Sequence, residues 1–270
     1  HAGYIDFAAN RCYDVNPLTT HAATVAYPPL SKLDATTMRI KARRIPTSDT
    51  ALVNLVRAQA TSQGQNPDNV SWLGALIRTT TATTVYDIFR PVFIECRCMV
   101  SPTQQGFGGA WWLFSGAAPK DYAEIDMIDM VGNLNYGWYT HYHMKLNDQT
   151  GPTTEQEYLM GAFPLADGFH TYGLHWTDTF IRMYRDGVLI DEQLSSVASY
   201  YDVPLRMYFS IAGWVSVAPL AATNEFYIDV DHVRVWKPGA SNVTVYPATG
   251  TLETSYTVTA GGQNSPVYPV

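Results

Sequence analysis

Three acidic side chains stand close together near the middle of the chain. Glu124 and Asp126 alternate with the apolar Ile125 and Met127, and alternation with a period of two is typical of a β-strand. Both carboxylates therefore share one face of the predicted strand. Asp129 follows Glu124 at an odd interval of five residues, so in a regular strand it would point to the opposite face.

One extra residue in this strand would bring Asp129 back to the face of Glu124 and Asp126. We predict a β-bulge around Met127 and Ile128, because a bulge sets two residues opposite one on the partner strand. Carboxylates gathered on one patch repel one another, which raises the pKa of at least one of them. Such a patch supplies a protonated acid beside an ionised carboxylate. Solvent-facing acids on an ordinary strand are the alternative that spacing alone leaves open.

The sequence around this strand resembles the signature of the family 16 glycoside hydrolases. That family carries the pattern E-[I/L]-D-x-x-E, which residues 124–129 match as E-I-D-M-I-D. It also carries an upstream run, G-x-W-P-A-F-W-L-L, which residues 106–114 match as G-F-G-G-A-W-W-L-F. Two positions depart from the family: Asp129 stands where the second Glu is usual, and Gly108 where a Trp is usual. The resemblance covers roughly residues 70–237.

The resemblance implies a role for each of the three acids. Glu124 would be the nucleophile, Asp126 the auxiliary carboxylate that holds Glu124 in its correct state, and Asp129 the general acid/base. Retaining hydrolysis needs the two working carboxyl groups about 5–5.5 Å apart. An Asp side chain is one methylene shorter than Glu, about 1.5 Å of reach. The sequence leaves open whether the backbone compensates, the protein is slow, or the substitution was introduced to trap substrate.

Tryptophan side chains are the candidate platforms for sugar rings, because the apolar faces of sugars stack on indoles. Trp112 matches the tryptophan that lines the family's cleft, and Trp214 is the second candidate. Trp111 alternates away from Trp112 and is expected to face the core. Core packing is the alternative for any one of these residues.

Two histidines are further candidates for substrate binding. His141 and His143 lie two apart in the alternating run 139–143, so they share a face of the predicted strand. If this strand pairs beside that of Glu124, one of them could hydrogen-bond Asp126 or the sugar. A packed or solvent-facing histidine is the alternative.

Composition favours an all-β protein. The 18 Tyr, 10 Phe and 7 Trp suit strands, and 19 Gly with 16 Pro suit the turns between them. Only 15% of the residues are charged, the net charge is −7, and no Lys/Arg cluster stands out, which argues against a nucleic-acid partner. No apolar run approaches the roughly 20 residues that span a bilayer. We expect a secreted or periplasmic monomer that handles polysaccharide.

At least eight alternating runs predict two packed antiparallel sheets. They lie at 36–45, 72–79, 85–89, 92–100, 139–143, 169–177, 180–190, 205–214 and 225–236, and Asp186-Gly187 supplies the turn residues of a predicted hairpin. Residues 51–58 fit a strand or a short helix, and 147–157 read as a polar loop. The resemblance implies a concanavalin-like jelly-roll β-sandwich with a concave cleft. We expect an N-terminal segment (1–35) packed on the domain, the catalytic β-sandwich (36–240), and a C-terminal extension (241–270) that is an edge strand or a linker.

Several other polar residues are interpreted as structural. The pair Glu95 and Arg97 matches the family's F-E-A-R-x-K strand, and Asp229 and Asp231 lie in its usual closing strand. All three cysteines are expected to be free, because Cys96 and Cys98 lie two apart on one strand face, where a direct disulfide is strained.

The resemblance implies an endo-acting retaining glycoside hydrolase. It would cleave internal β-glycosidic bonds of a β-glucan or a galactan-type polymer by double displacement. No cofactor is required; a structural calcium would fit the family, but the sequence shows no motif for it. The alternative is a non-catalytic or weakly active lectin-like carbohydrate-binding protein, because Asp129 replaces the usual Glu acid/base.

Overall fold

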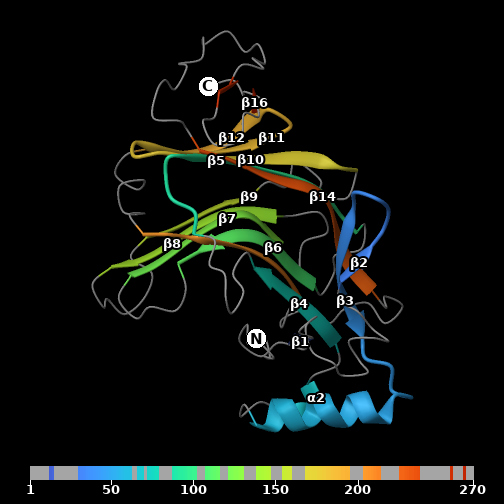
Figure 1. Ribbon diagram of the computed structural model, residues 1–270. Coiled ribbons are helices and arrows are strands. Elements are labelled where there is room, and N and C mark those ends of the chain that lie inside the picture. Colours follow the sequence, from blue (N-terminus) through green and yellow to red (C-terminus); the bar gives the residue numbers. More distant parts are fainter. Residues whose placement is uncertain are drawn as a thin grey trace.

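Two facing layers of β-strands make up the body of the protein in the computed structural model (Figure 1). The structure describes residues 12–14, 30–62, 66–69, 72–78, 87–101, 107–115, 121–130, 138–146, 154–159, 168–194, 203–213, 225–237, 256–257 and 264–265. The two facing layers confirm the predicted all-β sandwich. Among the described residues, no helix has the length and hydropathy that crossing a membrane requires.

The first layer runs in the hydrogen-bonded order β12-β11-β10-β5-β14-β3. Its strands are β3 (Met38–Arg44), β5 (Val92–Val100), β10 (His170–Trp176), β11 (Phe180–Arg185), β12 (Val188–Leu194) and β14 (Glu225–Trp236). The short strand β2 (Leu30–Lys32) pairs with β3 outside this path.

The second layer continues the same path as β4-β13-β6-β7-β8-β9. Its strands are β4 (Trp72–Arg78), β6 (Phe107–Phe114), β7 (Asp121–Met130), β8 (Trp138–Leu146), β9 (Thr154–Leu159) and β13 (Arg206–Gly213). The layers join where β3 pairs with β4, at Arg43–Leu73 and Arg44–Trp72. Strand β1 (Cys12–Asp14) pairs in parallel with β4, and β15 (Tyr256–Thr257) pairs with β16 (Asn264–Ser265).

The core lies between the two layers and is built from alternate residues of the strands. Its largest fully buried side chains include Trp72 of β4, Trp111 of β6 and Trp176 of β10. Cys96 and Cys98 of β5 lie in the same cluster as free thiols, as expected, and burial raises the pKa of Cys96 well above its usual value. The side chain of Cys12 lies outside the described residues.

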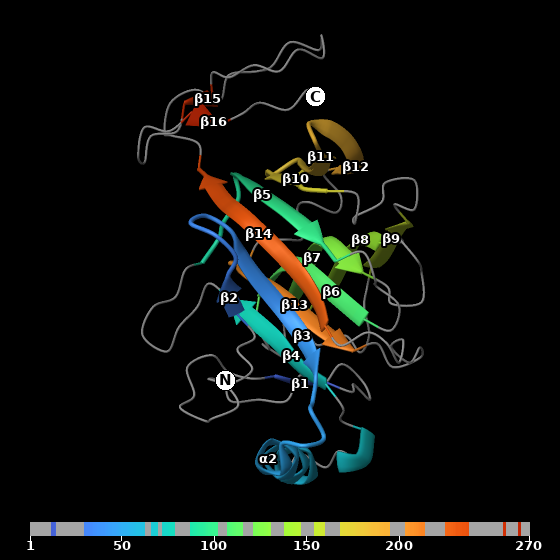
Figure 2. The same ribbon diagram turned by 90° about the vertical axis from the view of Figure 1, so that its right-hand side faces the viewer.

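A helix packs at the end of the sandwich where β4 begins (Figure 2). This helix, α2 (Thr50–Ser62), occupies the stretch for which the sequence pattern allowed either a strand or a helix. The Asp49 side chain accepts a hydrogen bond from the backbone N–H of Leu52 at 3.0 Å, which is N-terminal capping. Leu52, Val56 and Ala60 are buried at a spacing of four residues and pack in one cluster with Leu73. A one-turn 3₁₀-helix, η1 (Pro67–Asn69), follows.

Two sequence-based expectations are corrected by the strand pattern. The polar stretch 147–157 was expected to be a loop, but its end forms part of β9, whose polar residues pair with β8. The strand predicted over 85–89 is reduced, in its described part, to a single antiparallel bridge between Ile88 and Leu205. Strands β5 and β14 begin and end at the predicted residues.

Candidate active site

A β-bulge interrupts β7 at the predicted position. Asp126 is paired with His141 of β8, and Asp129 with Tyr139. Two residues of β7, Met127 and Ile128, therefore stand opposite a single residue of β8. The register of β7 against β6 shifts at the same place, between Trp111 and Trp112. The odd spacing of Asp129 is absorbed by this extra residue, as the sequence predicted.

The bulge places the three acids on one face of the sheet. Ile125, Met127 and Ile128 are all buried in the core between the layers, so Glu124, Asp126 and Asp129 face the other way. Asp126 is only 4% exposed, whereas the other two are half-buried. The most enclosed of the three carboxylates is therefore the central one.

Neighbouring strands extend this acidic face on the side of β6 and β13. Phe114 is the β6 partner of Glu124, Trp112 that of Asp126, and Ala110 that of Asp129. Directly opposite residues share a face of an antiparallel sheet, so these three side chains lie beside the acids. Strand β13 continues the rows with Arg206 beside Phe114, Tyr208 beside Trp112 and Ser210 beside Ala110. We call this surface the carboxylate face; it comprises Ala110, Trp112, Phe114, Glu124, Asp126, Asp129, Arg206, Tyr208 and Ser210.

Aromatic rings gather next to Asp126 on the carboxylate face. The Trp112 ring centroid lies 4.7 Å from that of Tyr208 and 5.4 Å from that of Phe114. Trp112 thus lies where the sequence placed it, beside the acids, and Trp111 faces the core as expected. The partners of Asp129 are smaller, since Ala110 and Ser210 carry short side chains. The face therefore offers an apolar platform beside Asp126 and more room beside Asp129.

The remaining candidates are placed only in part. His143 is the β8 partner of Glu124 and His141 that of Asp126, so their backbone positions border the acids as the sequence predicted. The side chains of His141 and His143 lie outside the described part of the structure, and so does the whole of Trp214. The contact of these three residues with a sugar stays a prediction.

A comparison with protein-family models gives the match that decides the family. The model of glycosyl hydrolases family 16 matches residues 92–229, about half of the chain. The chain belongs to glycosyl hydrolases family 16. The matched region contains the bulged strand with its three acids, together with all of the carboxylate face.

Solved structures of family 16 enzymes share the fold. An endo-β-1,3-glucanase from Pyrococcus furiosus superposes with a TM-score of 0.58 at 18% identity, covering 84% of this chain and 80% of that one. The laminarinase catalytic domain from Thermotoga maritima gives 0.58 at 16% identity, covering 84% and 82%. A family 16 enzyme from Bacteroides ovatus, solved with a mixed-linkage glucan product, gives 0.57 at 17% identity, covering 76% and 84%. None of the curated proteins matches the sequence significantly.

Three members of the carboxylate face were missed by sequence reasoning. Tyr208 and Arg206 lie in a predicted strand, and Phe114 ends the run of residues 106–114. Their place beside the acids depends on which strands pair, and alternation alone does not report that. The Arg206 guanidinium is held by the Asp87 carboxylate, with a Nε–Oδ1 distance of 3.1 Å. This family 16 chain thus presents a cation on the same row of the sheet as Glu124.

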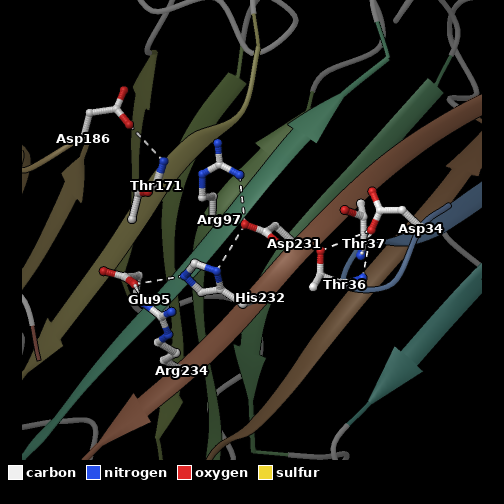
Figure 3. Close-up of polar contacts among 10 residues, drawn as sticks. All are labelled: Asp34, Thr36, Thr37, Glu95, Arg97, Thr171, Asp186, Asp231, His232 and Arg234. Atoms are coloured by element: carbon white, nitrogen blue, oxygen red, sulfur yellow. Dashed lines mark hydrogen bonds and ion pairs between the residues drawn. The ribbon is translucent and has the colours of Figure 1, made fainter. Parts of the chain in front are cut away.

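A second charged cluster lies on the outer face of the first layer (Figure 3). The buried Glu95 accepts hydrogen bonds from His232 at 3.1 Å and from Arg234 at 3.3 Å, while Arg97 pairs with Asp231 at 2.9 Å. Each charge in this cluster has an opposite partner, which supports the structural interpretation of Glu95 and Arg97.

The other predicted structural acid, Asp229, is also paired. It is fully buried and accepts two hydrogen bonds from Arg39, at 2.7 and 2.8 Å. These hydrogen bonds to Asp229 raise the pKa of Arg39. Among the described residues, no group of three or more His, Cys, Asp or Glu side chains is arranged to hold a metal ion.

Proposed function

We propose that the protein is an endo-acting retaining glycosidase with its active site on the carboxylate face. The observation that carries this proposal is the bulge in β7, which sets Glu124, Asp126 and Asp129 on one face beside Trp112 in a chain of family 16. An ordinary strand with solvent-facing acids would need no bulge to gather them.

The proposed reaction uses the three acids in two steps. In the first, the Glu124 carboxylate attacks the anomeric carbon while Asp129 donates its proton to the departing glycosidic oxygen. In the second, Asp129 takes a proton from water, the water oxygen attacks the same carbon, and Glu124 is released. Asp126, the most buried of the three, holds Glu124 in orientation and charge state.

The proposed substrate is a β-glucan that contains 1,3-linkages. Two of the similar structures are described as an endo-β-1,3-glucanase and a laminarinase, and a third holds a mixed-linkage glucan product. The rings of Trp112, Tyr208 and Phe114 offer an apolar platform for sugar faces. A net charge of −7 disfavours a strongly anionic polymer, although a neutral galactan has the same ring chemistry.

One observation favours a second function. Asp129 is about 1.5 Å shorter than the Glu it replaces, and a misplacement of about 1 Å can lower a rate on the order of 10²-fold. A chain with such a weakened acid could bind a polysaccharide in the manner of a lectin and cleave it slowly or not at all.

The composition and the family resemblance also support a proposal for the location, oligomeric state and partners of the enzyme. We propose a secreted or periplasmic monomer that acts without a cofactor on polysaccharide rather than on nucleic acid or membranes. The catalytic unit would be the β-sandwich of residues 36–240, with residues 1–35 packed on it and 241–270 as an extension.

A panel of polysaccharides separates the two functions. Laminarin, mixed-linkage β-glucan, agarose, porphyran and carrageenan would be incubated with the protein and scored for new reducing ends and for binding. We expect the wild type to release new reducing ends from the 1,3-linked glucans. The Asp129→Asn variant, which lacks the proposed proton donor, should release none from these polysaccharides. The same variant should still release an activated leaving group such as a dinitrophenolate. Binding without cleavage by the wild type would establish the lectin-like function, and an unchanged polysaccharide rate in Asp129→Asn would remove Asp129 from the mechanism.

A further inference from the structure

A buried hydrogen bond lies directly behind the bulge of β7. Thr140 is the one residue of β8 that stands between the partners of Asp126 and Asp129. Its side chain is fully buried on the core side, opposite Met127 and Ile128. The Thr140 hydroxyl donates a hydrogen bond of 3.0 Å to the Asp191 carboxylate on β12, which is itself only 7% exposed.

This contact joins strands that are far apart in the sheet. The hydrogen-bonded path begins at β12 and ends with β8 and β9, so the bond links one end of the path to the strand next to the other end. Along the hydrogen-bonded path, every strand except β9 lies between β12 and β8, and the ladder alone fixes their separation poorly. We call the Thr140–Asp191 hydrogen bond the inter-layer tether.

The inter-layer tether is a polar contact in apolar surroundings. Ile125, Met127 and Ile128 belong to the hydrophobic core cluster, where an unpaired hydroxyl or carboxylate is costly. A hydrogen bond to a carboxylate also has a narrower range of favourable distances and angles than an apolar contact. The tether therefore locates Thr140 relative to the first layer more closely than apolar packing would.

The position of Thr140 determines the geometry of the acids. Its neighbours in β8 are Tyr139 and His141, and these are the ladder partners of Asp129 and Asp126. A shift of Thr140 moves both partners and thus changes the spacing across the bulge. The tether acts from the core side and touches none of the three acids through any described contact.

We propose that Thr140 and Asp191 are positioning residues that hold the bulge of β7, and so set the separation between Glu124 and Asp129. This inference rests on the proposed glycosidase function. The separation matters because a displacement of about 1 Å can change the rate on the order of 10²-fold, and the short Asp129 side chain leaves little reach to absorb it.

Matched variants test the tether. Thr140→Val replaces the hydroxyl by a methyl group of similar size, and Thr140→Ser keeps the hydroxyl. The control is Ser101→Ala, directly after the end of β5, which removes a hydroxyl that is 2% exposed and accepts a hydrogen bond of 3.3 Å from the Tyr227 backbone N–H, away from β7 and β8. We expect Thr140→Val to lower kcat about tenfold or more with KM changed by less than about twofold. Thr140→Ser should restore most of kcat, and Ser101→Ala should leave it unchanged.

A second measurement does not depend on turnover. Backbone amide resonances of Asp126, Ile128 and Asp129 should shift in Thr140→Val and in Asp191→Ala, but not in Ser101→Ala. Unchanged resonances in a folded Thr140→Val protein would overturn the tether, as would an unchanged kcat. Equal losses of kcat in Thr140→Val and Ser101→Ala would overturn it as well, because the effect would then be general destabilisation. A wild-type protein that cleaves no polymer while Thr140→Val still moves these resonances would refute the glycosidase function and leave the structural role of the tether standing.

Discussion

At the scale of single residues, the proposed chemistry depends on one side chain that differs from its family. Asp129 occupies the position of the second Glu in the E-[I/L]-D-x-x-E signature, and the bulge in β7 turns it to the face of Glu124. The backbone thus places position 129 on the correct face, and the missing methylene is the remaining difference. Its ladder partner Ala110 and the adjacent Ser210 are small, so the face has room for a longer acid.

Lengthening this acid should therefore accelerate the reaction. We expect Asp129→Glu to raise kcat on a 1,3-linked β-glucan by about 10- to 100-fold, because about 1.5 Å of reach is restored to the proton donor. Initial rates of reducing-end release measure the effect. The same substitution at Asp178→Glu, on an exposed residue paired with Arg90, serves as the control and should change nothing. A slower Asp129→Glu enzyme would show that the backbone is already arranged for the shorter side chain.

At the scale of elements, alternation in the sequence located most of the strands and left two elements undecided. Leu52, Val53, Leu55 and Val56 fit either a half-buried strand or one helical face, and only the buried spacing of Leu52, Val56 and Ala60 shows the helix. Strand β9 is composed of T-E-Q-E-Y-L, which lacks an apolar stripe. Such a strand forms because β8 supplies hydrogen-bond partners, and that pairing cannot be read from its own residues.

Strand β10 carries a partly buried imidazole that makes stability depend on pH. The His175 ring centroid lies 4.9 Å from that of Phe180 and 6.1 Å from that of Phe93. Burial, with a further contribution from the charge of Arg182, lowers the pKa of His175 to about 4. In the unfolded chain the pKa is about 6.5, so between these values the unfolded state binds a proton that the folded state excludes. The free energy of unfolding therefore falls as the pH falls through this window.

Acid should destabilise the protein through this residue. From pH 7 to pH 4.5 we expect His175 to remove about 2–3 kcal/mol from the free energy of unfolding. Urea unfolding at the two pH values, compared between wild type and His175→Gln, isolates this contribution from that of the carboxylates. The variant should be less stable at pH 7 and should lose about 2–3 kcal/mol less on acidification. An equal loss in both proteins would show that His175 already titrates normally in the folded state.

At the scale of the whole molecule, two layers form one continuous path of strands that folds back on itself (Figure 1). The β3–β4 pairing joins the layers near the middle of that path, and the inter-layer tether joins strands near its two ends. The carboxylate face lies on the outer side of the second layer. This arrangement sets the proposed site against a well-packed core.

The candidate site was predictable in its acids and not in its surroundings. The interval between Glu124 and Asp129 indicated a bulge, and the alternation of Trp111 and Trp112 favoured the core for one ring and the acidic face for the other. Tyr208 and Arg206 reach the site through the pairing of β13 with β6, and Asp191 reaches Thr140 across the core. Such contacts join residues more than fifty positions apart, where local periodicity carries no information.

The configuration of the first product tests the central claim most directly. Proton NMR during cleavage of a 1,3-linked β-glucan resolves the anomeric signals of the new reducing ends before mutarotation. If Glu124 is a nucleophile in a double displacement, the β-anomer appears first and the α-anomer grows in later, and Glu124→Gln gives neither. Initial release of the α-anomer would contradict the retaining mechanism, and unchanged cleavage in Glu124→Gln would contradict the site itself.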